Sequence, residues 1–219
     1  MKITLKTIWT YGLITILIGS ARIVKAQVVE NELQTRTELE LSFKPVKKLK
    51  LTFMPQLRFD EDFSLDRYLF ETGAEYKPLK FMELGAAYRF VVNPRDTKST
   101  EYFNRYSFSA TAKKEFGRFE PAFRLRYSNY ADDDITDKNF IRYKASLKYD
   151  IANCKLTPFV ASELFQQADG GGLYKMRYST GLNYKLFKNN YLGVSYKFDY
   201  YNTEYLNKHI ISLGYKIKF

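Results

Sequence analysis

The chain has few of the residues that most often carry chemistry. Its 219 residues include one cysteine, Cys154, and one histidine, His209. A single cysteine excludes an internal disulfide framework and a Cys/His metal set, so we expect no metal and no cofactor. Cys154 is interpreted as a tolerated small residue in a turn.

Long hydrophobic runs are also missing after residue 26. A membrane-spanning helix needs roughly 20 consecutive apolar residues, and no later segment supplies them. The mean hydropathy is −0.40. The strands of a membrane β-barrel alternate in polarity, which keeps the mean hydropathy low. The sequence is therefore compatible with a membrane β-barrel, although it excludes a helical membrane protein.

Residues 1–26 have the features of a secretory signal peptide. Two lysines precede an apolar stretch over residues 7–19, and Val24-Lys25-Ala26 places small or branched side chains at the cleavage positions. An uncleaved anchor helix is the alternative, but the apolar stretch is short for one. We predict an exported mature chain with a single domain, residues 27–219.

The net charge is modest once this segment is removed. The whole chain carries +11, and residues 1–26 hold four basic residues and no acids, which leaves 11 − 4 = +7. These charges are spread over many segments rather than gathered in one patch. We therefore expect no binding to nucleic acid.

The mature chain is a series of segments in which apolar and polar residues alternate. Tyr143, for example, stands between Arg142 and Lys144. A period of two is that of a β-strand, whereas a helix would mix Arg and Tyr on every face. The segments are 33–43, 49–59, 67–77, 82–92, 101–114, 119–130, 139–150, 155–167, 173–186, 191–202 and 209–219.

These eleven segments pose a counting problem, because bacterial barrels normally have an even number of strands. A short strand at Gln27–Asn31 would give twelve. Omitting the segment 155–167, which contains Pro158, would give ten. An odd barrel closed by a parallel pair is a rarer possibility. We predict an all-β, antiparallel transmembrane barrel of about twelve strands, within a range of ten to twelve.

The connections between the segments are of two alternating kinds. Tight, basic turns occupy 44–48, 78–81, 115–118, 151–154 and 187–190. Longer, mostly acidic loops occupy 60–66, 93–100, 131–138, 168–172 and 203–208. Short turns at one end and longer loops at the other are typical of outer-membrane barrels, with the short turns in the periplasm.

Alternation alone does not say which face points inward. A soluble β-sandwich or lipocalin-like barrel would turn its apolar face inward. The export signal, the turn asymmetry and the aromatic terminal strand favour the opposite arrangement, with the aromatic face on lipid. We therefore predict a cell outer membrane location, with lipid and lipopolysaccharide as the surroundings of a monomer.

The last eleven residues carry a recognisable pattern. Ser212, Gly214, Ile217 and Phe219 resemble the C-terminal assembly signal of outer-membrane β-barrels at all four of its positions. That resemblance implies insertion by the barrel-assembly machinery, with Ile217 and Phe219 as the recognised residues.

The mature chain as a whole resembles a family of exported outer-membrane β-barrels of unknown function. The resemblance rests on the stretch from Leu39 to Phe90 and on Gly214-Tyr215-Lys216. The matching motifs are Glu38-Leu39-Glu40-Leu41 at the start of that stretch, then Asp66-Arg67-Tyr68 and Leu84-Gly85-Ala86-Ala87-Tyr88-Arg89-Phe90. These are motifs of architecture, so the resemblance implies a fold and no activity.

The face predicted to point inward is rich in charge. Its basic row is Arg58, Arg89, Arg105, Arg124, Arg126, Arg142, Lys144, Arg177 and Lys197. Acidic residues on the same face include Glu38, Glu40, Glu71, Glu75, Glu83, Glu163 and Asp199. Charges in a narrow lumen must pair or stay hydrated. They indicate either a salt-bridged, plugged interior or a basic-lined pore that favours anions.

Enzymatic activity is not favoured by the few reactive residues. An outer-membrane lipid hydrolase needs a Ser nucleophile within hydrogen-bond reach of a His base. Ser212 lies three residues after His209, so in a strand the two face opposite sides. Gly170-Gly171-Gly172 lacks the strand–loop–helix context of a phosphate cradle and is interpreted as a flexible loop.

A run of acidic residues, Asp132-Asp133-Asp134 followed by Asp137, suggests a possible Ca²⁺ site. It lacks the spacing and the glycine of an EF-hand loop, so a solvated loop tip is the better interpretation.

Taken together, the sequence predicts a non-enzymatic barrel, either structural or forming a narrow passive pore for small polar solutes or ions. The alternatives are a barrel that binds a ligand or partner through its loops, and a lipid-modifying hydrolase.

Overall fold

The computed structural model describes residues 31–95, 99–132, 138–202 and 205–219. The predicted signal peptide, residues 1–26, lies outside the described residues. Within these ranges no helix is long and apolar enough to cross a membrane. All the regular structure in the described residues is β-strand.

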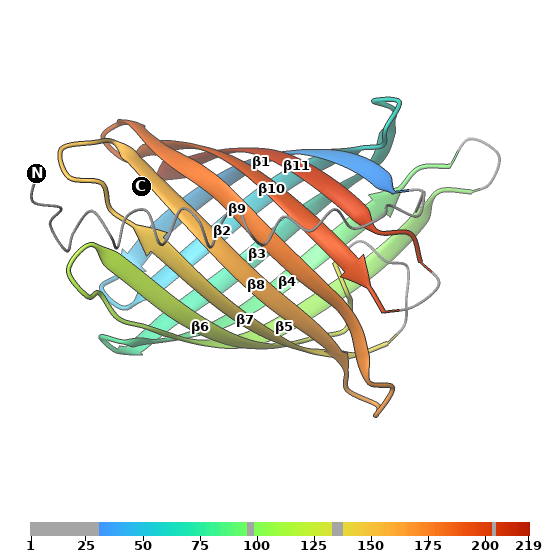
Figure 1. Ribbon diagram of the computed structural model, residues 1–219, viewed down its shortest axis with the longest axis horizontal. Helices are drawn as coiled ribbons and strands as arrows, with labels where there is room; N and C mark the ends of the chain where they lie inside the picture. Colours follow the sequence, from blue (N-terminus) through green and yellow to red (C-terminus); the bar gives the residue numbers. More distant parts are fainter. Residues whose placement is uncertain (1–30, 96–98, 133–137, 203–204) are drawn as a thin grey trace, which may run out of the picture. The chain divides into compact units, whose positions relative to one another are not determined.

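Eleven strands form a closed barrel (Figure 1). They are β1 (Glu32–Val46), β2 (Leu49–Phe59), β3 (Leu65–Leu79), β4 (Met82–Asn93), β5 (Glu101–Lys113), β6 (Phe119–Ser128), β7 (Phe140–Tyr149), β8 (Leu156–Gln167), β9 (Leu173–Phe187), β10 (Asn190–Tyr201) and β11 (Lys208–Lys218). Each strand pairs with the next in sequence, and β1 pairs with β11. Every strand predicted from alternation is present, including β8 with Pro158 inside it.

Eleven strands fall within the predicted range of ten to twelve, but the preferred count of twelve is not confirmed. β1 and β11 pair directly and in parallel, from Glu32 opposite Lys208 to Ser42 opposite Lys218. This pairing, which we call the seam, closes the barrel without a further strand. It makes the odd number possible, because both strands at the seam run from the loop end to the turn end.

Opposite charges on the two sides help to explain how the seam is held. Lys208 contacts Glu32 at 2.8 Å, and Lys216 contacts Glu40 at 2.6 Å. Gly214 lies opposite Glu38. A Cβ atom at position 214 would approach the Glu38 side chain to 3.2 Å, so this part of the predicted assembly signal also has a packing role.

The apolar face of the strands points outward. Leu57, Tyr88 and Leu125 are 43%, 47% and 43% exposed, whereas Arg58 and Arg89 beside them in sequence are 1% and 7% exposed. A soluble barrel has the reverse arrangement, with its apolar side chains inside. The charged face therefore lines the barrel interior, and the interior is where a site must be sought.

The interior differs between its two ends. Toward the longer loops, an aromatic cluster of Phe140, Phe165, Tyr174 and Tyr201 packs with Ala131. Toward the short turns, small residues of β10 and β11 leave a hollow of about 420 Å³. On β9, Gly181 is required for close packing, because a Cβ atom would lie 2.5 Å from the carbonyl oxygen of Val194. We call these two regions the loop half and the turn half.

Candidate functional site: an aspartate inside an arginine cage

The loop between β6 and β7 carries one carboxylate into the barrel. Its first residues are fixed by the wall: Arg105 donates a hydrogen bond to the carbonyl oxygen of Asn129 at 3.0 Å, and the Ser128 hydroxyl donates to that of Tyr130 at 2.8 Å. Asp132 follows with a φ of 76°, a left-handed conformation that Asp tolerates better than most residues. Its side chain is only 7% exposed.

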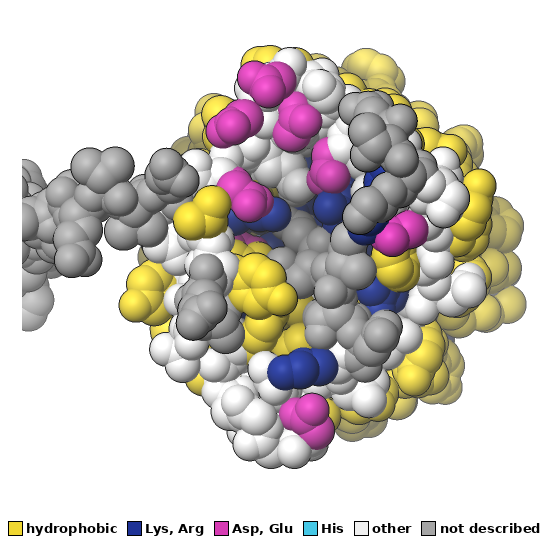
Figure 2. Space-filling model, turned by 90° about the vertical axis from the view of Figure 1, so that its right-hand side faces the viewer, with side chains coloured by type: hydrophobic (Ala, Val, Ile, Leu, Met, Phe, Trp, Pro, Cys, Tyr) yellow, Lys and Arg dark blue, Asp and Glu magenta, His cyan; other side chains and the backbone are white. Residues whose placement is uncertain are grey.

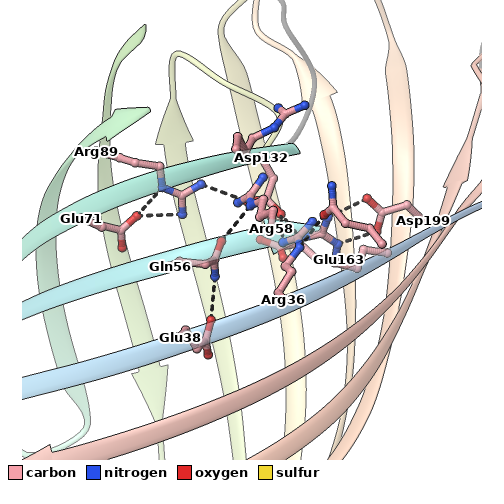
Figure 3. A network of polar contacts seen from close by, with 12 residues as sticks. Arg36, Glu38, Gln56, Arg58, Glu71, Arg89, Asp132, Glu163 and Asp199 are labelled. Carbon is pink, nitrogen blue, oxygen red and sulfur yellow. Dashed lines mark hydrogen bonds and ion pairs between the residues drawn. The ribbon is translucent and has the colours of Figure 1, made fainter. Parts of the chain in front are cut away.

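Four arginines from four strands surround this carboxylate (Figure 3). Arg177 lies 2.6 Å from one oxygen and Arg36 3.1 Å from the same oxygen. Arg89 and Arg58 contact the other oxygen at 3.0 Å and 3.4 Å. We call these four residues the arginine cage. They come from β1, β2, β4 and β9, so Asp132 links distant parts of the wall across the lumen.

Two glutamines orient one side of the cage. The Nε of Arg36 donates to Gln34 at 2.7 Å, and the Nε of Arg58 donates to Gln56 at 2.8 Å. Gln56 in turn donates to Glu38 at 2.7 Å. Each glutamine lies two residues from its arginine on the same strand, which is the spacing that places both on the inner face.

Two further carboxylates hold the other side of the cage. Glu71 accepts from Arg89 at 2.8 Å. Asp199 accepts from the Nη2 of Arg177 at 2.6 Å and contacts Lys175 at 3.0 Å. Charge-assisted, two-point bonds of this kind fix the guanidinium planes, so the cage is preorganised around the position of Asp132.

An aromatic residue of the same loop closes the space beside the cage. Tyr130 is 1% exposed. The guanidinium carbon of Arg89 lies 4.9 Å from its ring centre, and that of Arg142 lies 6.0 Å away. Arg142 also lies 4.3 Å from the ring centre of Phe165. Stacked guanidinium and aromatic groups of this kind fill the loop half of the lumen.

The cage determines the charge state of Asp132. Burial alone would raise the pKa of this carboxyl group, but the charges of Arg177, Arg36, Arg58 and Arg89 hold the pKa well below its usual value of 3.8. The residue is therefore a carboxylate at neutral pH, and four arginines face one negative charge.

The structure places the nine residues of the predicted basic row as follows. Arg58, Arg89 and Arg177 belong to the cage, and Arg105 holds the base of the loop. Arg124 and Arg142 share Glu163, at 2.9 Å and 3.1 Å. The last three residues, Arg126, Lys144 and Lys197, lie half-buried on the inner wall.

Sequence reasoning missed Arg36, Lys175 and the part played by Asp132. Arg36 alternates with Thr35 and Thr37, so the same pattern could have added it to the row. Asp132 is not a solvated loop tip, because arginines more than 40 residues away in sequence draw it inside. Residues 133, 134 and 137 of the acidic run lie outside the described residues.

The remaining candidates lie away from the cage. His209 is on the outer face, where its Nδ1 lies 2.6 Å from the hydroxyl oxygen of Tyr196, while Ser212 is buried on the inner face. Ile217 and Phe219 lie on the outer face at the turn end. Cys154 is exposed. Among the described residues, no group of three His, Cys, Asp or Glu side chains could hold a metal ion.

Comparison with known proteins gives a family but no activity. A family described as "Protein of unknown function (DUF2490)" matches residues 33–208. The chain belongs to this DUF2490 family. The match runs from the second residue of β1 to the first residue of β11, so it covers β2 to β10 in full. No curated protein matches the chain.

Comparison with solved structures adds no information about the function of this DUF2490 protein. One comes from work described as "Unveiling the Mechanism Behind the in-meso Crystallization of Membrane Proteins". It is 12% identical and aligns over 78% of this chain and 71% of its own, with a TM-score of 0.40. At that score the likeness carries no argument about function.

Proposed function

We propose that this DUF2490 protein is an outer-membrane β-barrel that forms a narrow, passive passage for small anions, closed at its loop end by Asp132. The observation that carries the proposal is the arginine cage. Basic side chains line a lumen, and one carboxylate on a loop occupies the place where they converge. Rings of Arg and Lys favour anions in pores.

The membrane location rests on the outer face and on the sequence. Apolar and aromatic side chains cover the outside of a closed barrel, as lipid requires. The C-terminal pattern supports insertion by the barrel-assembly machinery. In this setting the protein is a monomer that contacts lipid and lipopolysaccharide, and its role is not enzymatic.

The direct test is single-channel recording in a planar bilayer. The chain from Gln27 onward is refolded, checked as a heat-modifiable barrel, and compared with Asp132→Asn. We expect the unchanged protein to be closed for most of the record. Asp132→Asn removes the charge that the cage holds, so anion-selective openings become more frequent and longer.

Asp150→Asn is the matched control, because Asp150 is an exposed carboxylate in a turn at the opposite end of the barrel. It leaves the record unchanged. If folded Asp132→Asn conducts no more than this control, Asp132 is not a gate. If every folded variant is silent, the barrel is not a pore.

Ion preference tests the role of the inner wall separately from the gate. Arg124 and Arg126 lie on β6 and face the interior. Reversing both charges, Arg124→Glu with Arg126→Glu in the Asp132→Asn background, shifts the reversal potential in a salt gradient toward cations. An unchanged reversal potential contradicts anion selection by these residues.

A barrel that binds a ligand or partner through its loops is the second candidate. It is favoured by the acidic rim of the loop end, where Figure 2 shows Asp and Glu side chains around a basic interior. Described acidic residues of these loops include Asp60, Glu61, Asp62 and Asp169, and Glu101 begins β5 at the same end. Such a rim can share divalent cations with lipopolysaccharide phosphates. A melting temperature that EDTA leaves unchanged argues against this role.

A further inference from the structure

Three cations on the inner wall form no ion pair with a carboxylate of the described residues. Within the described residues, no carboxylate oxygen lies within 4.0 Å of a charged nitrogen of Arg126, Lys144 or Lys197. The Nε atoms of Arg124 and Arg126 are both buried and have no hydrogen-bond partner. A guanidinium with an open Nε still has a donor to offer a ligand.

These cations belong to one neighbourhood. Arg124 on β6 lies opposite Lys144 on β7, and Arg126 lies opposite Arg142. Lys144 lies opposite Glu163 on β8, and its other charged neighbours, Arg124, Lys197 and Arg142, are all basic. Strands β6, β7 and β10 therefore present their positive side chains to a common part of the lumen.

Carboxylates in this neighbourhood do not balance the charge. Glu163 is already shared by Arg124 and Arg142. Lys197 has Glu38 and Asp132 as acidic neighbours. Glu38 accepts a hydrogen bond from Gln56, and Asp132 is held by the arginine cage. Glu71 lies near Arg126 but is bonded to Arg89. Charges of one sign gathered away from bulk water are costly unless a counter-ion compensates them.

Space for such a counter-ion lies beside them. The hollow of about 420 Å³ in the turn half is lined by Ser195, Ser212 and Lys148. Lys197 is the next inward residue after Ser195 on β10. Lys144 lies four residues before Lys148 on β7, on the same face. The hollow therefore lies next to the part of the inner wall that carries Lys144 and Lys197.

We propose that Arg126, Lys144 and Lys197 form a binding site for a small oxyanion of the phosphate class. Arg supplies planar, paired donors that match an oxyanion, and each Lys supplies a compact charge. Arg124 adds its open Nε. The claim that this site lies on the path of a conducted anion rests on the proposed function. The claim that it binds an oxyanion does not require conduction.

Calorimetric titration of the refolded barrel with inorganic phosphate tests the site, with sodium chloride as the ionic control. We expect saturable phosphate binding that Arg126→Gln or Lys144→Gln weakens by about tenfold or more. Lys77→Gln is the matched control, because Lys77 is 45% exposed at the turn end and pairs with Glu83. Absent binding, or equal binding by all these variants, overturns the proposal.

Thermal unfolding provides a second readout. Without phosphate, Lys144→Met removes an uncompensated charge and raises the melting temperature. Phosphate raises the melting temperature of Lys144→Met by less than it raises that of the unchanged protein. A fall in melting temperature without phosphate means that the charge was already compensated, which overturns the site. If the protein does not conduct but still binds phosphate, the proposed passage is wrong and the proposed binding site is supported.

Discussion

The two halves of the barrel interior differ in how far side chains fill the lumen. In the loop half, long charged and aromatic side chains fill the lumen and a loop carboxylate joins them. In the turn half, Gly193, Ser195, Ser212 and Gly214 leave it open. The strands continue through both halves, so the difference comes from the side chains at the inner positions and from the residues of the β6–β7 loop.

The largest expected effect comes from breaking the loop half at its centre. Asp132→Asn leaves four arginines without their shared charge. Breaking a buried ion pair costs about 3–5 kcal/mol, and we expect the free energy of unfolding to fall by about that much. Urea unfolding in detergent measures it. Asp169→Asn, an exposed loop variant, should change it by less than about 0.5 kcal/mol. Equal effects of the two would mean that the cage is not structural.

The pH dependence of the free energy of unfolding, compared between the unchanged protein and Asp132→Asn, tests this result further. The folded pKa of Asp132 lies below its usual value of 3.8, so its stabilising contribution is complete above that value. The contribution is lost as the pH falls through the lowered pKa. The difference between the unchanged protein and Asp132→Asn should therefore be constant from pH 7 to about pH 4 and shrink in stronger acid. A difference that shrinks near pH 6 contradicts the assignment.

A substitution in the turn half should be far milder. Ser195 lines the hollow, so Ser195→Leu finds space and should change the free energy of unfolding by less than about 1 kcal/mol. Because the added side chain enters the hollow, it should reduce the conductance of the Asp132→Asn channel. If Ser195→Leu unfolds the barrel, the turn half is packed rather than hollow.

The smallest effect is expected at the seam. Glu40 and Lys216 are each about one-third exposed, at 27% and 31%, so their ion pair is partly screened. Glu40→Gln should cost between about 0 and 1 kcal/mol. A double-mutant cycle of Glu40→Gln with Lys216→Gln measures the coupling free energy between these two side chains. A coupling as large as that of Asp132 with Arg177 would make the seam, and not the cage, the main stabilising feature.

The contrast between the halves marks what the sequence could and could not predict. A period of two assigned β4 and β7 to within a residue at each end, and it assigned the inner face of Arg89 and Arg142. It could not assign partners across the lumen. Arg36 and Asp132 are 96 residues apart, and no local pattern links a strand residue to a loop residue on the far side.

The preferred count of twelve strands was one too high for a related reason. Alternation found eleven segments, and the expectation of an even number led to twelve. Nothing local distinguishes a parallel closing pair, because its pairing is set by two strands from opposite ends of the chain. Lys208 opposite Glu32 and Lys216 opposite Glu40 become informative only after the strands are aligned.

The parallel seam also limits how the chain could be rewired. In a barrel closed by antiparallel strands, the first and last strands can be joined by a tight turn and the chain reopened elsewhere. Here β1 begins at the opposite end from where β11 finishes. β11 has 11 residues, so a connector would have to run back roughly 36 Å along the outside of the wall. Circular permutation of this barrel therefore needs a linker as long as a strand.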